Sequence, residues 1–368
     1  MKVLIITPRY PPAFHGGGEI SVKLLAENLK KNNIDVTVLS FDGNKEEIIN
    51  NVNIIRKALP FRGALFKKLS MMFYIKNISR DFDVIHAYNI FFYEYLGLLC
   101  KFFGTRIIGS LNNLPDIHLG ETKNPLKKIK RMLFNNIRLK LMSNLNYFIC
   151  ISKTLKQEYL KKGFESQKIF VIPNMLDYKF LISLNRVKKS KKIYILFVGL
   201  LYKTKGVDIL LRAVRESYRK HKNIRLNIIG KGSEYGPLNK LCAELKLKRI
   251  TKFKENVDYN HIISEYDQAD IFVHPGRWNE PFGRTIIEAM SRKVPVLVSN
   301  TGAPPIIVNE QDLTYEPEDF LELSNKLNML IENKRLRIYF SKKLYKNSLR
   351  YTPERILPKI IRIYKTLL

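Results

Sequence analysis

Short apolar runs alternate with amphipathic helical patterns along most of this chain. Ile20, Leu24, Leu25 and Leu29 recur at the spacing of one helix face. Short β-branched runs separated by such helical patterns are typical of a parallel sheet covered on both faces. The pattern predicts strands at residues 3–7, 36–39, 52–55, 84–87, 106–108, 148–151 and 170–172.

The alternation is interrupted once and then begins again. A polar, basic stretch at 185–192 is typical of a linker. The second half has predicted helices at 207–218 and 238–245, and predicted strands at 194–198, 226–229, 271–273 and 296–299. We therefore predict an α/β protein with two doubly wound, Rossmann-like domains, residues 1–184 and 185–349, and a final helix at 350–368 that packs back toward the first domain. Ligands bind such sheets at the carboxyl ends of the strands, so the cleft between the domains is the expected site.

The stretch 280–288, read as EPFGRTIIE, combines two carboxylates with a glycine turn and the start of a helix. The free N–H groups and the dipole at a helix start favour an anion. Glu280 and Glu288 are unusual beside an anion, but both can accept hydrogen bonds from hydroxyl groups. A nucleotide sugar offers a diphosphate with hydroxyl-rich groups at both ends.

Three further glycine loops fall at predicted strand ends. Gly16, Gly17 and Gly18 open the first helix, and backbone without side chains can approach a ligand closely. The segment from Gly199 to Gly206 places Lys205 beside a helix start, where it can act as a point charge on a phosphate. The run 230–234, GKGSE, repeats the design and contributes Gly232. Each loop alone is also compatible with an ordinary turn.

The ordered set of these motifs resembles the retaining glycosyltransferases of the GT-B fold that carry two glutamates separated by seven residues. Besides EPFGRTIIEAM, the resemblance rests on the GGGE loop, Asp83-Val84-Ile85-His86, Ile149-Cys150-Ile151-Ser152, Ile172-Pro173-Asn174 with Asp177, Phe197-Val198-Gly199, Ile228-Ile229-Gly230-Lys231-Gly232, Ala269-Asp270, His274-Pro275 and Pro295-Val296.

This resemblance implies a nucleotide-sugar donor in the second domain and a glycan or lipid-linked acceptor on the first. It implies that Glu280 holds the donor sugar, that Lys205 holds the diphosphate and is catalytic together with Glu280, and that Glu288 holds the ribose. The remaining implied donor contacts are Gly17, Gly18, Gly199, Gly232, Phe282, Gly283, Arg284 and Thr285, and the implied acceptor contacts are His86 and Asn112.

The chain departs from the family pattern at three places. Leu200 stands where the family usually has an arginine after the strand-end glycine, so Lys203 or Arg284 is expected to supply the missing phosphate charge. Asn112 stands where many members have histidine. The segment 302–306, GAPPI, replaces the usual Gly-Gly-x-x-Glu.

A two-carboxylate hydrolase is a poorer interpretation of the glutamate pair. Eight residues of helix separate two groups by about 12 Å, whereas a retaining glycosidase needs carboxyls about 5 Å apart. The resemblance implies instead a hexosyl transfer with retention, without a protein nucleophile, a metal or another cofactor, in which the donor phosphate helps to deprotonate the acceptor. Electrostatic stabilisation of the departing diphosphate is expected to be a major contribution.

The net charge of +31 predicts an anionic partner. The runs 62–80 and 123–140 are basic and contain no acid, and the second has Leu126, Ile129, Leu133 and Ile137 at helical spacing. Such a helix suits an anionic membrane surface, although a solvated basic face is the alternative. No apolar run is long enough to span a membrane. Three widely spaced cysteines, Cys100, Cys150 and Cys242, favour reduced thiols over a zinc site.

We therefore expect a cytoplasmic glycosyltransferase, peripheral at the inner face of the membrane, that builds a surface polysaccharide or glycolipid and binds no nucleic acid. A nucleotide-sugar epimerase of the same architecture is the alternative, and a polyanion-binding protein is a less favoured one. An epimerase would convert the donor alone, and a polyanion binder would keep its DNA affinity without Glu280 and Glu288.

Overall fold

The computed structural model describes residues 1–12, 16–58, 64–88, 93–116, 124–181, 192–255, 259 and 261–368, and the side chains of all of these except 64–68. The chain divides into two compact units. Unit 1 contains Met1–Met175 and Pro353–Leu368, and unit 2 contains Leu176–Thr352. The boundary therefore lies at Met175 rather than at the predicted residue 184, and the predicted linker lies almost entirely outside the described residues.

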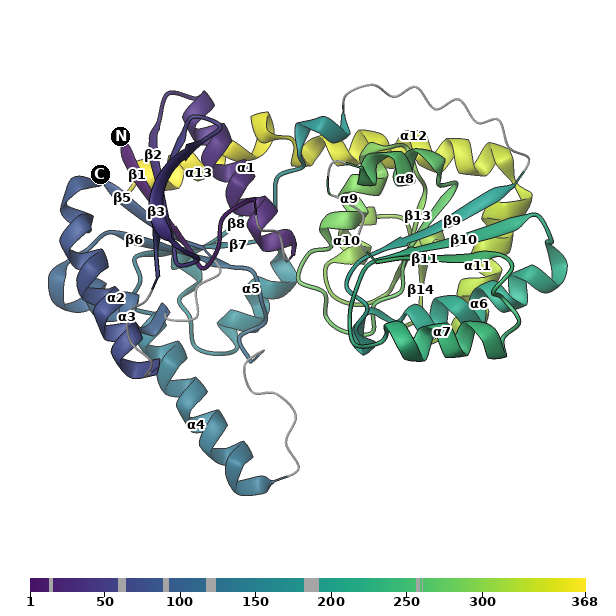
Figure 1. Cartoon of the computed structure of the whole chain (residues 1–368), viewed down its shortest axis with the longest axis horizontal. Helices are drawn as coiled ribbons and strands as arrows, with labels where there is room; N and C mark the ends of the chain where they lie inside the picture. Colours follow the sequence, from purple (N-terminus) through teal and green to yellow (C-terminus); the bar gives the residue numbers. More distant parts are fainter. Residues whose placement is uncertain are drawn as a thin grey trace. The chain divides into compact units, whose positions relative to one another are not determined.

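Unit 1 is built on an eight-stranded sheet with the order β3-β4-β2-β1-β5-β6-β7-β8. The strands are β1 (Lys2–Thr7), β2 (Asp35–Ser40), β3 (Asn44–Ile49), β4 (Val52–Lys57), β5 (Val84–Ala87), β6 (Ile107–Leu111), β7 (Tyr147–Cys150) and β8 (Ile169–Val171). The helices are α1 (Gly17–Lys31), α2 (Ala64–Ile78), α3 (Tyr93–Phe103), α4 (Pro125–Met142), α5 (Lys153–Leu160) and α13 (Pro353–Lys365). Helices α1 and α13 lie together against one face of the sheet, and α2 and α3 against the other (Figure 1).

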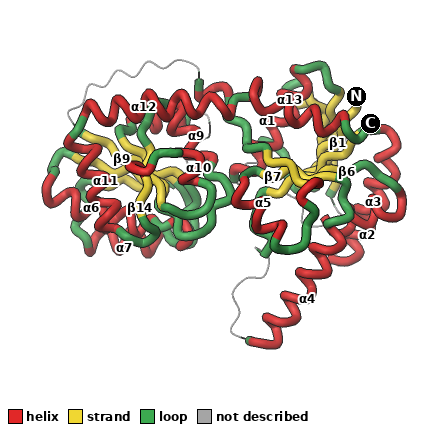
Figure 2. The backbone as a smooth tube through the Cα atoms, turned by 180° about the vertical axis from the view of Figure 1, so that it is seen from behind, coloured by secondary structure: helices red, strands yellow, loops and turns green. Residues whose placement is uncertain are grey.

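Unit 2 has a six-stranded, wholly parallel sheet with the order β11-β10-β9-β12-β13-β14. Its strands are β9 (Ile193–Val198), β10 (Ile224–Ile229), β11 (Thr251–Lys254), β12 (Ile271–His274), β13 (Val296–Ser299) and β14 (Thr314–Tyr315). Its helices are α6 (Val207–Lys220), α7 (Tyr235–Glu244), α8 (Ile262–Gln268), α9 (Arg284–Ser291), α10 (Pro304–Val308), α11 (Phe320–Glu332) and α12 (Lys334–Ser348). Helices α6, α7 and α11 cover one face, and α9 and α12 pack together on the other (Figures 1 and 2).

The apolar runs form the centres of both sheets, as their pattern predicts. Every residue of β5, β6, β12 and β13 is buried, because helices cover both faces of these strands. The two doubly wound domains predicted from the sequence are therefore present.

The sheet of unit 1 is not wholly parallel. β3 pairs with β4 in an antiparallel hairpin, and the connecting residues Asn50 and Asn51 both have positive φ, as a tight hairpin turn requires. The hydrophobic pattern did not predict β3, because its residues, NKEEII, are mostly polar and exposed. Strand β11 and the two-residue β14 were not predicted either.

Among the described residues no helix is long and apolar enough to cross a membrane. The C-terminal helix α13 contacts α1 within unit 1 and buries Ile356, Ile360 and Tyr364. Cys150 and Cys242 are buried and Cys100 is half-buried, and all three are free thiols.

Candidate functional site

The stretch with the two glutamates connects β12 to α9 in unit 2. β12 ends at His274 and α9 begins at Arg284, so the predicted order of strand, glycine turn and helix is present. Gly283 precedes the helix with a φ of 95°, a conformation that favours glycine. Glu280 therefore lies in the turn, and Glu288 lies one helical turn into α9, so the segment between the two glutamates is only partly helical and not the eight residues of helix expected.

Glu280 is surrounded by positive and hydrogen-donating groups. Its Oε2 forms an ion pair with the Lys205 ammonium and accepts a hydrogen bond from Trp278 Nε1 at 2.9 Å. The ring of His274 lies 3.6 Å from the same oxygen. Burial alone would raise the pKa of Glu280, but the His274 ring and the Lys205 charge outweigh it and hold that pKa at about 2. Glu280 is therefore a carboxylate at neutral pH.

Lys205 reaches Glu280 because the loop after β9 packs closely against the loop after β12. Lys205 ends a short turn after β9, and Gly206 follows it in the left-handed conformation. A Cβ on Gly206 would lie 1.9 Å from the backbone oxygen of Pro275, so only glycine allows this approach. The sequence motifs place Lys205 and Glu280 in one site but do not indicate that the two side chains bind each other.

A third loop supports the backbone of Glu280. Gly302 follows β13, and a Cβ there would lie 2.5 Å from the nitrogen of Glu280. The N–H of Ala303 donates to the carbonyl oxygen of Glu280 at 2.9 Å. The GAPPI segment departs from the family pattern in sequence, yet its glycine gives Glu280 a close backbone contact.

Glu288 has a different environment. Its side chain is only 3 % exposed, and Oε2 accepts a hydrogen bond from the Tyr266 hydroxyl at 2.9 Å. Within the described part of the chain, no group donates a hydrogen bond to its other oxygen, Oε1. Burial raises the pKa of Glu288, and the charge of Arg284 opposes this shift in part. A buried carboxylate oxygen without a donor is costly, which suits a ligand hydroxyl.

Tyr266 and Trp278 are site residues that the sequence analysis missed. Tyr266 lies on α8, a short helix with no motif, and Trp278 precedes the recognised EPFG stretch by two residues. Trp278 is the single tryptophan of the chain. Trp278 lies beside two charged groups, Lys205 and Glu280, and only the fold shows this position.

The other predicted donor residues lie at the same edge of the sheet. Phe282 and Gly283 are buried, while Arg284 and Thr285 are half-buried in the first turn of α9. The Phe282 ring packs edge-on against Tyr351 at 5.7 Å between centroids, so the Phe282 side chain is structural. Only the backbone of Phe282 is therefore available to contact a ligand.

Gly199 and Gly232 both lie where the backbone of one loop approaches the backbone of another closely. A Cβ on Gly232 would lie 2.3 Å from the backbone oxygen of Leu201, and one on Gly230 would lie 1.8 Å from that of Gly199. The loops after β9 and β10 therefore touch through their backbones. The donor contacts of Gly199 and Gly232 stay predictions.

In unit 1 a pocket lies at the ends of β5 and β6. It is lined by Ser21, His86, Tyr88, Ser110, Asn112, Asn174 and several apolar side chains from β7, α1 and α13. The predicted acceptor residues His86 and Asn112 therefore share one pocket.

His86 forms part of the pocket wall and uses both ring nitrogens. Nδ1 lies 2.6 Å from the Tyr364 hydroxyl of α13, and Nε2 lies 2.7 Å from Ser110 Oγ. Complete burial lowers the pKa of His86 to about 3, so the ring is neutral at pH 7. Its direct contribution to the fold is to join β5, β6 and α13.

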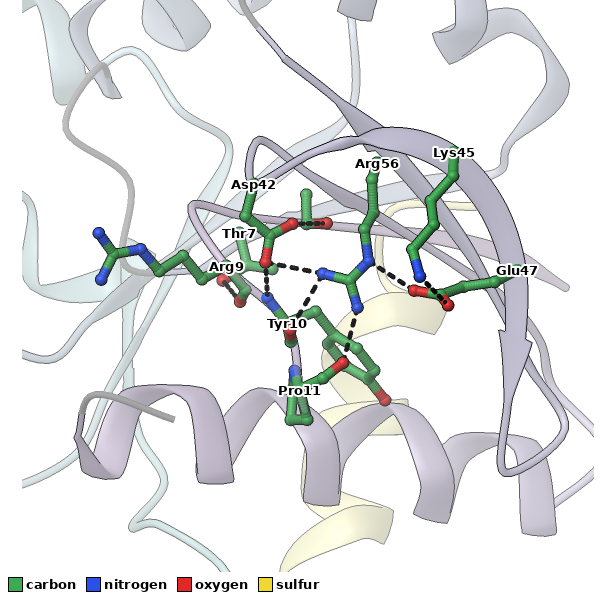
Figure 3. A network of polar contacts seen from close by, with 9 residues as sticks. Thr7, Arg9, Tyr10, Pro11, Asp42, Lys45, Glu47 and Arg56 are labelled. Atoms are coloured by element: carbon green, nitrogen blue, oxygen red, sulfur yellow. Dashed lines mark hydrogen bonds and ion pairs between the residues drawn. The ribbon is translucent and has the colours of Figure 1, made fainter. Parts of the chain in front are cut away.

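The glycines at the start of α1 follow a loop that a buried arginine holds in place. Gly17 and Gly18 lie in the first turn of α1, while His15 lies outside the described residues. Arg56 donates to the backbone oxygens of Tyr10 at 3.1 Å and Pro11 at 2.7 Å (Figure 3). The carboxylates of Asp42 and Glu47 neutralise its charge at 2.7 and 2.6 Å. The hairpin of β3 and β4 thus supports the loop that leads to these glycines.

Among the described residues no group of three or more histidine, cysteine, aspartate or glutamate side chains could hold a metal ion.

Two family models match this chain. The model for glycosyl transferases group 1 matches residues 182–347, and the model for glycosyltransferase family 4 matches residues 15–180. The first includes the glutamate stretch with its partner Lys205, and the second includes the lining of the unit 1 pocket except for the residues of α13. Together they cover nearly the whole chain.

Individual proteins agree with these models. The chain is 27 % identical over 340 residues to an uncharacterized glycosyltransferase of Methanocaldococcus jannaschii, with 84 % of this chain and 83 % of that protein covered. It is 25 % identical over 335 residues to the capsular polysaccharide biosynthesis glycosyltransferase CapM of Staphylococcus aureus, with 84 % of each covered.

Among solved structures, Anabaena HepE in complex with UDP-glucose has the same fold, with a TM-score of 0.81, 18 % identity and all of both chains covered. The GT-B glycosyltransferase family indicated by the motifs is thus confirmed. With its two α/β units and the matches to both family models, the chain belongs to the glycosyltransferases of group 1 and has the GT-B fold.

Proposed function

We propose that this protein transfers a hexose with retention from a nucleoside-diphosphate sugar, which binds in unit 2 between Lys205, Glu280 and Glu288. The observation that carries the proposal is Glu288 Oε1, a buried carboxylate oxygen that lacks a donor among the described residues. A ribose hydroxyl supplies such a donor. HepE, which has this fold, was solved with UDP-glucose, and this supports a uridine nucleotide as the first donor to try.

The diphosphate is assigned to the first turn of α9 and to Lys205. The N–H groups at a helix start are oriented toward an anion, and Arg284 adds a positive charge there. Lysine has three N–H donors, so Lys205 can keep its ion pair with Glu280 while it binds a phosphate oxygen. Positive charge at the leaving diphosphate is what supports metal-independent transfer.

Glu280 is assigned to orient the donor sugar rather than to attack it. Its low pKa makes it a weak base and a weak nucleophile, and Lys205 occupies one of its oxygens. We propose that an acceptor hydroxyl oxygen bonds to the anomeric carbon as the carbon–oxygen bond to the diphosphate breaks. The proton of that hydroxyl passes to the departing phosphate oxygen, and the new bond forms on the same face.

The acceptor is assigned to the pocket of unit 1. Its polar lining from His86, Ser110, Asn112 and Asn174 has no formal charge at pH 7, which suits a hydroxyl-rich glycan or the sugar of a lipid-linked acceptor. CapM, a relative over most of its length, is named for capsular polysaccharide biosynthesis, which supports a role in surface polysaccharide or glycolipid synthesis. We further propose that the protein works at the anionic inner face of a membrane.

Donor binding is tested with the full chain and its single tryptophan. UDP-glucose, UDP-galactose, UDP-N-acetylglucosamine and GDP-mannose are titrated separately while the fluorescence of Trp278 and the melting temperature are followed. We expect one of these to quench Trp278 and raise the melting temperature in a concentration-dependent way. An unchanged melting temperature and fluorescence with all nucleotide sugars would overturn the proposal. Conversion of the bound donor to its epimer without an acceptor would overturn transfer in favour of epimerisation.

A further inference from the structure

The first half of helix α4 exposes large apolar side chains that no described part of unit 1 covers. Every residue from Asn124 to Phe134 is exposed. Leu126, Ile129, Leu133 and Ile137 share one face at a spacing of three, four and four residues, and they are 77, 55, 60 and 60 % exposed. Met132 and Phe134, off this face, are exposed as well. This half of the helix extends away from the rest of unit 1 (Figures 1 and 2).

The same half carries only positive charge. Lys127, Lys128, Lys130 and Arg131 are exposed, and α4 contains no acidic residue. These cations lie between the apolar positions and beside the apolar face. An amphipathic helix with this composition binds in the plane of a membrane, where lipid tails cover the apolar side chains and anionic headgroups meet the cations.

The second half of α4 packs against unit 1 and connects the exposed half to the segment that follows the acceptor pocket. Leu139 and Met142 are buried, and a Cβ on Gly97 of α3 would lie 1.9 Å from the backbone oxygen of Leu141. Asn135 donates to Asp116 Oδ1 at 2.9 Å, and Arg138 donates to the backbone oxygen of Pro115 at 3.1 Å. Both partners lie three to four residues after Asn112, which lines the pocket. The exposed half is thus the extension of a firmly packed helix.

We propose that residues 125–134 of α4 insert into the headgroup layer of an anionic membrane and thereby hold the acceptor pocket at the lipid surface. Ten helical residues span about 15 Å, which is too short to cross a bilayer, so the helix lies in the interface. A partner protein would cover one face of the helix. A membrane interface accommodates apolar side chains together with the surrounding cations, because lysine and arginine stems extend their charges toward the headgroups. This inference deepens the membrane location and the lipid-linked acceptor of the proposed function, but it does not depend on the donor assignment.

The test measures binding of the full chain to vesicles of phosphatidylglycerol mixed with phosphatidylcholine, by co-sedimentation. We expect binding that weakens as phosphatidylglycerol is replaced or salt is raised. The variant I129Q/L133Q removes apolar surface without adding charge, and its partition coefficient should fall at least about tenfold. The variant K127Q/K128Q/K130Q/R131Q removes four cations, each of which raises the partition coefficient about fivefold. Its partition coefficient should therefore fall on the order of 100-fold or more.

Matched controls come from unit 2. K334Q/R335Q/K342Q/K346Q removes four exposed cations from α12, and L321Q/I338Q removes two exposed apolar side chains. Both controls should bind vesicles within about twofold of the wild type. Circular dichroism and melting temperature check that every variant is folded.

Equal vesicle binding by the wild type and I129Q/L133Q overturns the proposal, as does equal binding to neutral and anionic vesicles. A dimer that I129Q/L133Q abolishes in sedimentation equilibrium without lipid also overturns it, since a second copy would then cover the helix. Trp278 fluorescence keeps this test separate from the proposed function. Donor affinity of the α4 variants should be unchanged, and a wild type that binds vesicles but no nucleotide sugar contradicts only the donor assignment.

Discussion

The two units line their candidate sites with opposite kinds of polar group. In unit 1 the pocket contains neutral groups, since burial keeps His86 uncharged and its other polar walls are hydroxyls and amides. In unit 2 the site concentrates charge, since the His274 ring and the Lys205 charge keep Glu280 ionised and Glu288 is buried within α9.

This difference indicates which ligand each unit suits. A neutral pocket can exchange hydrogen bonds with a sugar without desolvating a charge. A charged site is costly to bury unless its ligand compensates it, and a diphosphate between hydroxyl-rich groups does so at both ends. The contrast between the units therefore supports an acceptor on unit 1 and a donor on unit 2.

The largest effect is expected from Glu280→Gln in unit 2. The variant keeps the shape of the side chain but removes the charge that Lys205 and Trp278 bind. We expect kcat to fall about 100- to 1,000-fold, because preorganised electrostatic contacts act mainly in the transition state. Steady-state transfer assays measure this effect.

Glu318→Gln is the matched control, because Glu318 is an exposed partner of Arg277 at 3.3 Å. Its kcat should stay within about twofold of the wild type. A wild-type kcat in Glu280→Gln would contradict the conclusion that the unit 2 site depends on the charge of Glu280.

The next effect concerns pH and the neutral His86 of unit 1. The folded-state pKa of His86 is lowered from 6.5 to about 3, so its contribution to stability is full above pH 6.5 and is lost as pH falls toward 3. Between pH 6.5 and 5 the loss is about 2 kcal/mol, at 1.36 kcal/mol per pH unit. Urea unfolding at pH 7 and 5 should show this loss in the wild type and not in His86→Gln.

The exposed His261 supplies the control, since His261→Gln should keep the pH dependence of the wild type. Glu280 also contributes to stability, but this contribution is lost only below pH 4.5, outside the pH range of the experiment. Equal pH dependence for the wild type and His86→Gln would show that unit 1 does not bury a neutral imidazole.

The smallest effect is expected from Asn112→Ala. A neutral hydrogen bond contributes about 0.5–1.5 kcal/mol, so the KM for the acceptor should rise between about twofold and tenfold. Donor affinity, followed by Trp278 fluorescence, should not change. Asn53→Ala, at an exposed position of β4, should change neither quantity. A loss of donor affinity in Asn112→Ala would contradict the division of ligands between the units.

The parts predicted from the sequence are those that local patterns determine. Fully buried parallel strands are continuous apolar runs, so β1, β5, β12 and β13 could be found from hydrophobicity alone. The turn before α9 could be found because glycine at a positive φ follows an apolar strand. β3 escaped because an exposed antiparallel edge strand needs no apolar residues.

The contacts within the site could not be predicted from local patterns. Lys205 and Glu280 are 75 positions apart, and their ion pair depends on the backbone approach of Gly206 to Pro275. Tyr266 reaches Glu288 from a neighbouring helix whose sequence resembles any amphipathic segment. For α4 the sequence indicated the basic amphipathic pattern, but only the fold shows that no described residue of unit 1 covers its apolar face.

The central claim is that Glu288 binds the ribose of a nucleotide sugar, and a double-mutant cycle tests it most directly. Wild type and Glu288→Ala are each titrated with UDP-glucose and with its 2′,3′-dideoxyribose analogue, using Trp278 fluorescence. A hydrogen bond to a charged group contributes about 1.5–3 kcal/mol, so the analogue should bind the wild type about 10- to 150-fold more weakly. The account predicts that Glu288→Ala binds both ligands almost equally. An analogue that loses the same factor on both proteins would contradict it.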